Sequence, residues 1–160
     1  MERTTRLSVY EKRSDWQRAV WHELPDAFDF RVVGEKILDG RSLLVIEGVA
    51  QPGYKPQSPA AKLFRSLRVT FWVDQEDHQI VRVEAEVIDT ISVGLFLVRV
   101  AKGSRATLEL TWVGEGVWLP DRLQVFVSGR LGLLKGLRFE QRVQYSRYRI
   151  VPANSPTIRY

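Results

Sequence analysis

The sequence predicts a mainly β protein: a strongly curved antiparallel sheet of about eight strands with one or two short helices. Apolar and polar residues alternate with a period of two over most of the chain, which is typical of strands with one covered face. The connections between these runs are short and polar, as hairpins require. Helical periodicity is confined to a short segment near the amino terminus.

We expect the whole chain of 160 residues to form one domain, because a domain of that length buries roughly 70% of its unfolded surface. Residues 1–27 are expected to form a helical amino-terminal extension, residues 28–150 the sheet, and residues 151–160 a tail. The longest uncharged apolar run, Ile91 to Val98, is too short to cross a bilayer as a helix. The sequence has no cysteine, which excludes disulfides and thiolate sites.

A short helix is predicted near the amino terminus. Ser14 and Gln17 have the spacing of a capping box, and apolar residues follow at helical intervals. We therefore expect a helix from Asp15 to about Glu23. Pro25 should end this helix, because proline lacks the amide hydrogen that a helix interior uses.

A hairpin and a proline-rich loop are predicted next. Two extended runs, Phe28 to Leu38 and Arg41 to Ala50, flank Asp39-Gly40, a dipeptide that favours a tight turn. Three of the seven prolines lie in Gln51 to Ala61, which is predicted as a mobile loop leading into a helical turn over Lys62 to Ser66. Further strands are expected at Leu67 to Asp74, Ile80 to Thr90, Ser92 to Ala101, Arg105 to Val113, Val117 to Ser128 and Leu137 to Ile150.

One face of the predicted sheet is apolar and the other is polar. A large sheet curls, so its apolar side becomes concave, and the predicted helices are too short to cover it. The apolar side could be covered in four ways: by closure into a barrel, by a second copy of the chain, by helices outside this sequence or by a bound ligand. We expect a hydrophobic ligand to contact the apolar residues of this face: Val69, Phe71, Val73, Val81, Val83, Leu108, Leu110 and Trp112.

The chain shows no motif for catalysis or for a metal. Each of its two histidines has a structural explanation. His22 lies near the end of the predicted helix, where a cation suits the helix dipole, and His78 lies in an exposed polar turn. Glu84 and Glu86 share a strand face at a spacing suited to a metal, but pairing with Arg68 or Arg105 on the outer face explains them better. We therefore expect no catalytic residue, no metal and no cofactor.

The carboxyl-terminal segment is basic. Between Arg130 and Arg149 six cations face only Glu140, and the whole chain carries a net charge of +5. Such a cluster suits an anionic membrane surface, whereas a solvated strand face is the plainer alternative. We expect no nucleic acid partner, because no RNA-recognition signature accompanies the charge. The residues assigned to an anionic surface are Arg138, Arg142, Arg147 and Arg149.

Several short motifs occur in a suggestive order along the chain. They are Val33-Gly34-Glu35, Asp39-Gly40-Arg41, Phe71-Trp72-Val73-Asp74, Ile80-Val81-Arg82-Val83-Glu84 and Val117-Trp118-Leu119-Pro120. Over about Phe28 to Tyr148 the chain resembles bacterial periplasmic proteins of the Lol-type lipoprotein-sorting class, and the sigma-factor regulators that share their fold. The resemblance implies a half-barrel without enzymatic activity. Helices cover the concave side of such a half-barrel, which holds acyl chains or serves as a sensing surface.

The chain departs from this class in two respects. Its charged amino terminus lacks the apolar core of an export signal, and the helix and strands with which the class usually begins are not found. The resemblance implies a periplasmic location, whereas the sequence alone favours the cytoplasm or a chain that starts after its signal. The second departure is expected if the chain is the later part of a longer protein.

Two functional hypotheses follow. The first is a non-enzymatic, lipoprotein-sorting-like carrier whose partner is a lipid, a lipoprotein acyl chain or another hydrophobic ligand. The alternative is an envelope-sensing or protein-interaction module with a filled core and no small ligand. An enzyme built on a curved sheet is a third and weaker hypothesis. A carrier should contain a large apolar pocket, because acyl chains bind by burial of about 0.8 kcal/mol per methylene. The sequence predicts no oligomeric state.

Overall fold

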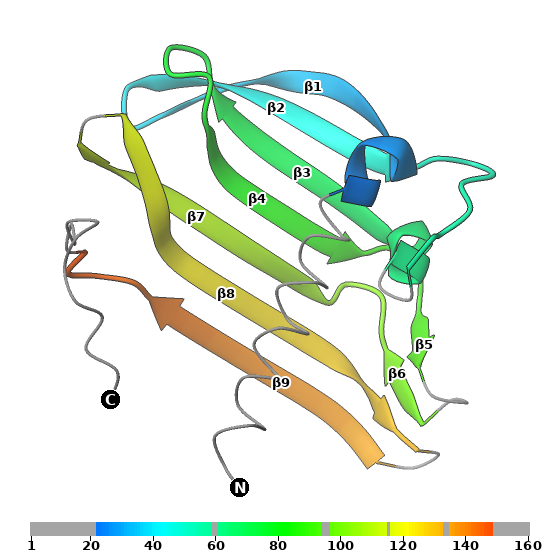
Figure 1. Ribbon diagram of the computed structural model, residues 1–160. Coiled ribbons are helices and arrows are strands. Elements are labelled where there is room, and N and C mark those ends of the chain that lie inside the picture. The colour runs from blue at the N-terminus through cyan, green and yellow to red at the C-terminus, as the bar shows by residue number, and fades with distance from the viewer. Residues whose placement is uncertain (1–21, 59–60, 94–96, 115, 133–134, 149–160) are drawn as a thin grey trace, which may run out of the picture.

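The computed structural model describes residues 22–58, 61–93, 97–114, 116–132 and 135–148. Nine strands in these ranges form one antiparallel sheet that is not closed, accompanied by two short helical segments (Figure 1). The predicted fold class, a mainly β half-barrel, is thereby confirmed. The strands are β1 (Phe28–Leu38), β2 (Arg41–Ala50), β3 (Leu67–Asp74), β4 (Ile80–Val87), β5 (Ile91–Val93), β6 (Val98–Val100), β7 (Arg105–Gly114), β8 (Val117–Leu131) and β9 (Lys135–Gln144).

The first hairpin and the helical turn lie where they were predicted. Asp39 and Gly40 join β1 to β2 with φ angles of 50° and 79°, both positive as a type I′ turn requires. The 3₁₀-helix η1 (Ala61–Ser66) precedes β3, as expected from the sequence. Local turn chemistry therefore fixes this part of the chain.

Several predicted element boundaries are wrong: β4 ends at Val87 rather than Thr90, β9 ends at Gln144 rather than Ile150, and two elements differ more. The helical segment at residues 22–27 continues through Pro25, because the φ angle that proline imposes is also a helical one; residues 15–21 of the predicted helix lie outside the described ranges. The predicted strand Ser92 to Ala101 is instead a hairpin of β5 and β6, in which Val93 pairs with Val98. A run that is apolar on both faces does not distinguish one strand from two short ones.

Strand β8 holds the lower part of the sheet together because it is long enough to pair with three strands. The order of the sheet is β1-β2-β3-β4-β7-β8-β6-β5, and β9 pairs with the other edge of β8. β7 pairs with β8 from Val117 to Phe126, and β6 takes its place from Gly129 to Leu131.

Two small residues allow this change of partner. The buried hydroxyl of Ser104 donates to the carbonyl oxygen of Ser128 at 3.2 Å and accepts from its amide at 3.1 Å. At Gly129 an added Cβ would lie 1.9 Å from the carbonyl oxygen of Arg99. The backbone of β6 therefore approaches β8 too closely for any residue but glycine.

The pairing register places apolar and charged side chains on opposite faces. Residues directly opposite in an antiparallel pair share a face, so each set of partners forms a row across the sheet. One apolar row consists of Val32, Ile46, Phe71, Val83, Leu108, Leu123 and Val143. The adjacent polar row consists of Arg31, Glu47, Thr70, Glu84, Thr107, Gln124 and Arg142. The predicted alternation is thus confirmed across seven strands.

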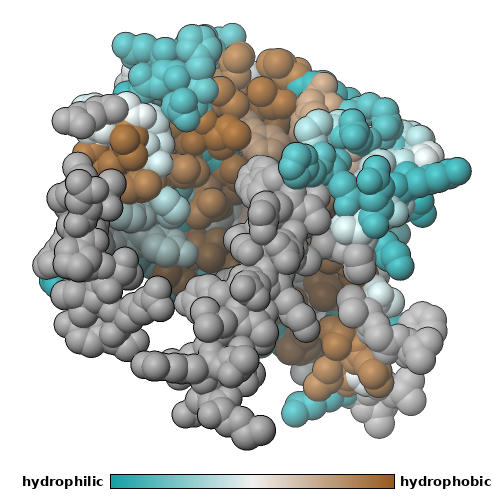
Figure 2. Space-filling model, in the orientation of Figure 1, coloured by the Kyte–Doolittle hydropathy of each residue, from teal (hydrophilic) through white to brown (hydrophobic). Residues whose placement is uncertain are grey.

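The hydrophobic core lies at one end of the apolar face. The helical segment 22–27, the loop after β2 and η1 lie over this end, and hydrophobic side chains gather on the same face (Figures 1 and 2). The rings of Phe28 and Phe64 pack with centroids 5.3 Å apart. The buried cluster consists of Ala27, Phe28, Tyr54, Ala61, Phe64 and Val69. None of the helical segments in the described ranges has the length and hydropathy needed to cross a bilayer.

Side-chain hydrogen bonds anchor the proline-rich loop to the helical segment. The buried Tyr54 donates its hydroxyl to Glu23, and the amide of Gln57 donates to the same carboxylate at 2.9 Å. Hydrogen bonds from Ser58 and Tyr54 lower the pKa of Glu23, while burial and the Glu23 carboxylate raise the pKa of Tyr54 to about 12. The described part of this loop, expected to be mobile from its composition, thus contributes a side chain to the core.

Replacement of Gly129 by alanine should destabilise the fold. The new Cβ must displace the β6 backbone, and such overpacking costs about 1–3 kcal/mol. Urea denaturation of the G129A variant measures this loss of unfolding free energy. Gly136→Ala is the matched control, since its Cβ meets nothing within 4 Å; equal stability of the two variants would contradict the close approach.

Candidate functional site

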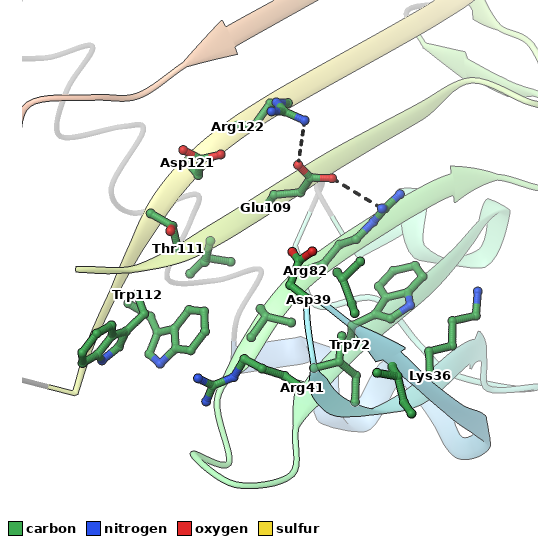
Figure 3. Close-up of a pocket in the computed structure, with 16 residues that line it drawn as sticks. Lys36, Asp39, Arg41, Trp72, Arg82, Glu109, Thr111, Trp112, Asp121 and Arg122 are labelled. Carbon is green, nitrogen blue, oxygen red and sulfur yellow. Dashed lines mark ion pairs between the residues drawn. The ribbon is translucent and has the colours of Figure 1, made fainter. Parts of the chain in front are cut away.

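The sheet contains a hollow of about 710 Å³ at the end opposite the core (Figure 3). Its volume lies within the range of about 300–1,000 Å³ that is usual for small-molecule sites. Six strands and the β1–β2 turn contribute its sixteen lining residues. They are Lys36, Ile37, Leu38, Asp39, Arg41, Leu43, Trp72, Val81, Arg82, Glu109, Leu110, Thr111, Trp112, Trp118, Asp121 and Arg122.

The charged part of the hollow lies on the polar face of the sheet. The register places Trp72, Arg82, Glu109 and Arg122 in one row with Val45, next to the polar row of Glu47 described above. Four of these five residues line the hollow. The charged part of the hollow therefore lies on the opposite face from the hydrophobic core, whereas Leu110 and Trp112 continue the β7 face of Leu108.

Four bulges or irregularities in the pairing lie near this end and bend the sheet. The residues skipped in the pairing register are Val33 in β1, Val81 in β4, Val113 in β7 and Asp121 in β8. A bulge bends its strand and increases the local twist. Val81 and Asp121 themselves line the hollow, so the irregularities that bend the sheet also supply part of its wall.

A contact between β2 and β8 spans the hollow. The guanidinium carbon of Arg41 lies 5.4 Å from the centroid of the Trp118 ring. Three strands separate β2 from β8, so a flat sheet would hold their backbones about 19 Å apart. The contact therefore indicates that this end of the sheet is strongly curled.

Charged residues form the floor of the hollow. Glu109 lies 3.4 Å from Arg82 and 3.3 Å from Arg122, and Figure 3 shows it between the two guanidinium groups. Arg82 also lies 3.4 Å from Glu84, and its guanidinium carbon is 4.8 Å from the centroid of the Trp72 ring. Ion pairs of this exposure contribute little to stability, so the network mainly orients its side chains.

Asp74 positions Arg41 at the edge of the hollow. This carboxylate is only 1% exposed, and it accepts hydrogen bonds from the amides of Glu76 and Asp77, both at 2.9 Å, and from Arg41. Arg41 also bonds Asp77. The bond from Arg41 and those from the two amides lower the pKa of Asp74 to about 2, and the same ion pair raises the pKa of Arg41.

Apolar side chains form the walls. Leu43 and Val81 are buried, and Trp72, Leu110 and Trp118 are half-buried. Trp112, at 56% exposed, is the most accessible tryptophan of the hollow. The arrangement is amphipathic: aromatic and aliphatic walls stand beside a floor of paired charges.

The ligand residues predicted from the sequence fall in two places. Val81, Leu110 and Trp112 line the hollow. Val69 belongs to the core cluster and Phe71 packs against it. The remaining three, Val73, Val83 and Leu108, are half-buried members of strands outside the lining of the hollow.

The sequence analysis did not identify the charged residues that form the floor of the hollow. Their pattern is typical of a solvated strand face; they are Arg82, Glu109 and Arg122. One signal was present: Trp72 occupies a polar position between Thr70 and the end of β3, and a large aromatic there often marks a binding surface.

The arginines assigned to an anionic surface lie apart from the hollow. Arg138 and Arg142 are exposed on the polar face of β9; Arg142 pairs with Glu140 at 2.9 Å, and Arg138 lies 5.7 Å from the Phe126 ring centroid. Arg147 is exposed beyond β9. Arg149 lies outside the described residues.

Glu84 and Glu86 each pair with an arginine, as expected for an outer strand face. Glu84 lies 3.4 Å from Arg82, and Glu86 lies 3.8 Å from Arg68. In the described ranges no three histidine, aspartate or glutamate side chains gather in a way that could hold a metal ion.

Comparison of the chain with protein-family models, with curated proteins and with solved structures finds no match. The function must therefore be argued from the chain itself. The hollow is the feature from which that argument proceeds.

Substitution of Asp74 by asparagine should lower the free energy of unfolding and make that free energy less dependent on pH in acid. The pKa of Asp74 is about 2 in the folded state against an ordinary value of 3.8, so its contribution is present above pH 3.8 and is lost as the pH falls through 2. We expect D74N to lose about 1–3 kcal/mol near neutral pH and to show a shallower loss below pH 3.8.

Urea denaturation across this pH range provides the measurement. Asp77→Asn serves as control, because Asp77 also pairs with Arg41 but is 37% exposed. An acid profile of D74N that matches the unsubstituted protein would contradict the assignment.

Proposed function

We propose that the protein is a non-enzymatic binding domain of lipoprotein-sorting type, which holds an acyl chain or a comparable hydrophobic ligand in the hollow of its curved sheet. The observation that carries this proposal is the hollow itself, with three tryptophans and three aliphatic side chains, Leu43, Val81 and Leu110, among its lining. A periplasmic location and an approach of Arg138 and Arg142 to anionic lipid belong to the same proposal.

The energetics support a ligand with a hydrocarbon body. Ten methylenes buried against the walls would contribute roughly 8 kcal/mol, which is comparable with the cost of association. The charged groups of the floor support a binding role rather than a catalytic one, because Glu109 is held by Arg82 and Arg122, and Arg41 by Asp74.

One observation favours the alternative of an interaction or sensing module. The core end of the apolar face is filled by the chain's own side chains, with Phe28, Phe64 and Val69 all buried. A ligand-free module would need no more than this core. The hollow at the other end then has no role, which is why we prefer the binding domain.

Titration with a dansyl-labelled fatty acid tests the proposal. We expect saturable binding with energy transfer from tryptophan, and about tenfold weaker binding by Trp112→Ala, because the lost aromatic surface corresponds to 1.4 kcal/mol or more. Phe139→Ala is the control, since this aromatic of β9 is 45% exposed and lies outside the lining.

Three outcomes would count against the proposal. An absence of saturable binding, together with no lipid in native mass spectra of gently purified protein, would favour the interaction module. Weakening by Phe139→Ala but not by Trp112→Ala would move the ligand to the apolar face. Equal weakening by both variants would indicate non-specific adsorption.

A further inference from the structure

Two residues that line the hollow each carry a buried hydrogen-bond donor without an acceptor. Among the described residues, the buried side-chain nitrogens without a partner are Gln75 Nε2, Arg82 Nε and Trp118 Nε1. Arg82 and Trp118 line the hollow. Buried donors are almost always satisfied in native structures, by protein, water or ligand. What this site lacks is therefore an acceptor and not another donor.

Arg82 is also held loosely by its carboxylate partners. Its contacts with Glu84 and Glu109 are both 3.4 Å, whereas well-formed bonds between guanidinium and carboxylate groups measure about 2.7–2.9 Å. Arg122, on the other side of Glu109, lies 3.3 Å from it and is 46% exposed. Two guanidinium groups thus share Glu109, and each retains N–H groups that can be directed into the hollow.

We propose that the ligand of this site carries an anionic oxygen head group, a carboxylate or a phosphate, which binds to Arg82 and Arg122 beside Glu109. Its hydrocarbon chain then runs along Trp72 toward Trp112, which Figure 3 shows at the β7–β8 end of the hollow, and toward Trp118, the partner of Trp112 across these two strands. This inference rests on the proposed function and specifies its ligand class.

The polar head group of the ligand is expected to determine selectivity, because burial of the ligand's hydrocarbon chain gives only a small net gain in binding free energy. Because the hydrocarbon contribution is comparable with the cost of association, selectivity must come from polar contacts. A planar guanidinium recognises two oxygens at once, which an ammonium group cannot reproduce. An amine head group beside Glu109 would meet Arg82 and Arg122 as like charges, and the lining as a whole has four cationic side chains, Lys36, Arg41, Arg82 and Arg122, against three carboxylates, Asp39, Glu109 and Asp121.

Calorimetric titration with four probes of equal chain length tests the inference: decanoate, decyl phosphate, decanol and decylamine. We expect at least one of the two anions to bind about tenfold or more tightly than decanol, and decylamine to bind most weakly. The comparison of decanoate with decyl phosphate identifies the head group. If all four bind alike, the inference fails and the proposed function stands; if none binds, both fail.

Arg82→Lys provides the decisive variant, because it keeps the charge and removes the Nε donor and the planar fork. We expect it to reduce the preference for the anion over decanol to about twofold, with the affinity for decanol unchanged. Arg142→Lys, on the same face of the sheet but outside the lining, should retain the full preference.

A retained preference in Arg82→Lys would overturn the assignment to this residue. If that variant does not fold, Arg122→Lys gives the same readout at a more exposed position, away from the Trp72 contact. A full preference in Arg122→Lys would then overturn the two-arginine site.

Discussion

The register that aligns seven strands is the constraint on which the rest of the structure depends. It places the row of Phe71 and Val83 on one face and the row of Thr70 and Glu84 on the other in all seven of these strands. A slip of one residue in any pair would exchange these faces. The separation of a dry core from a charged surface is thus set by pairing before any particular side chain packs.

Curvature then decides where a ligand can be held. A regular sheet with these rows would offer only its apolar side, and the core residues Phe64 and Val69 already close one end of it. The bulges at Val81 and Asp121 bend the opposite end and bring Trp118 to Arg41. The molecule consequently has a packed apolar face at one end and an amphipathic hollow with a charged floor at the other.

The sequence contains enough information for the strands other than β5 and β6, for the first turn and for the alternation, because each depends on local periodicity or on one dipeptide such as Asp39-Gly40. It does not reveal the face of the hollow. Nothing local distinguishes Val81 from the alternating residues around it, so its bulge is visible only in the pairing with β3. The charged floor is hidden for the same reason: Glu109 meets Arg82 and Arg122 only once three strands are aligned.

The bulge at Val33 has a consequence for how the edge strand can change during evolution. Beyond it, Glu35 lies opposite Leu44 and Lys36 lies opposite Leu43, so Lys36 rather than Glu35 borders the hollow. Removal of the Val33 codon would restore regular alternation and leave both pairings, and therefore both faces, unchanged, whereas removal of a codon between Glu35 and Leu38 would shift the charges to other faces. Ten of the eleven residues of β1 are exposed, so the strand should accept many replacements of side chain while tolerating a change of length only at its bulge.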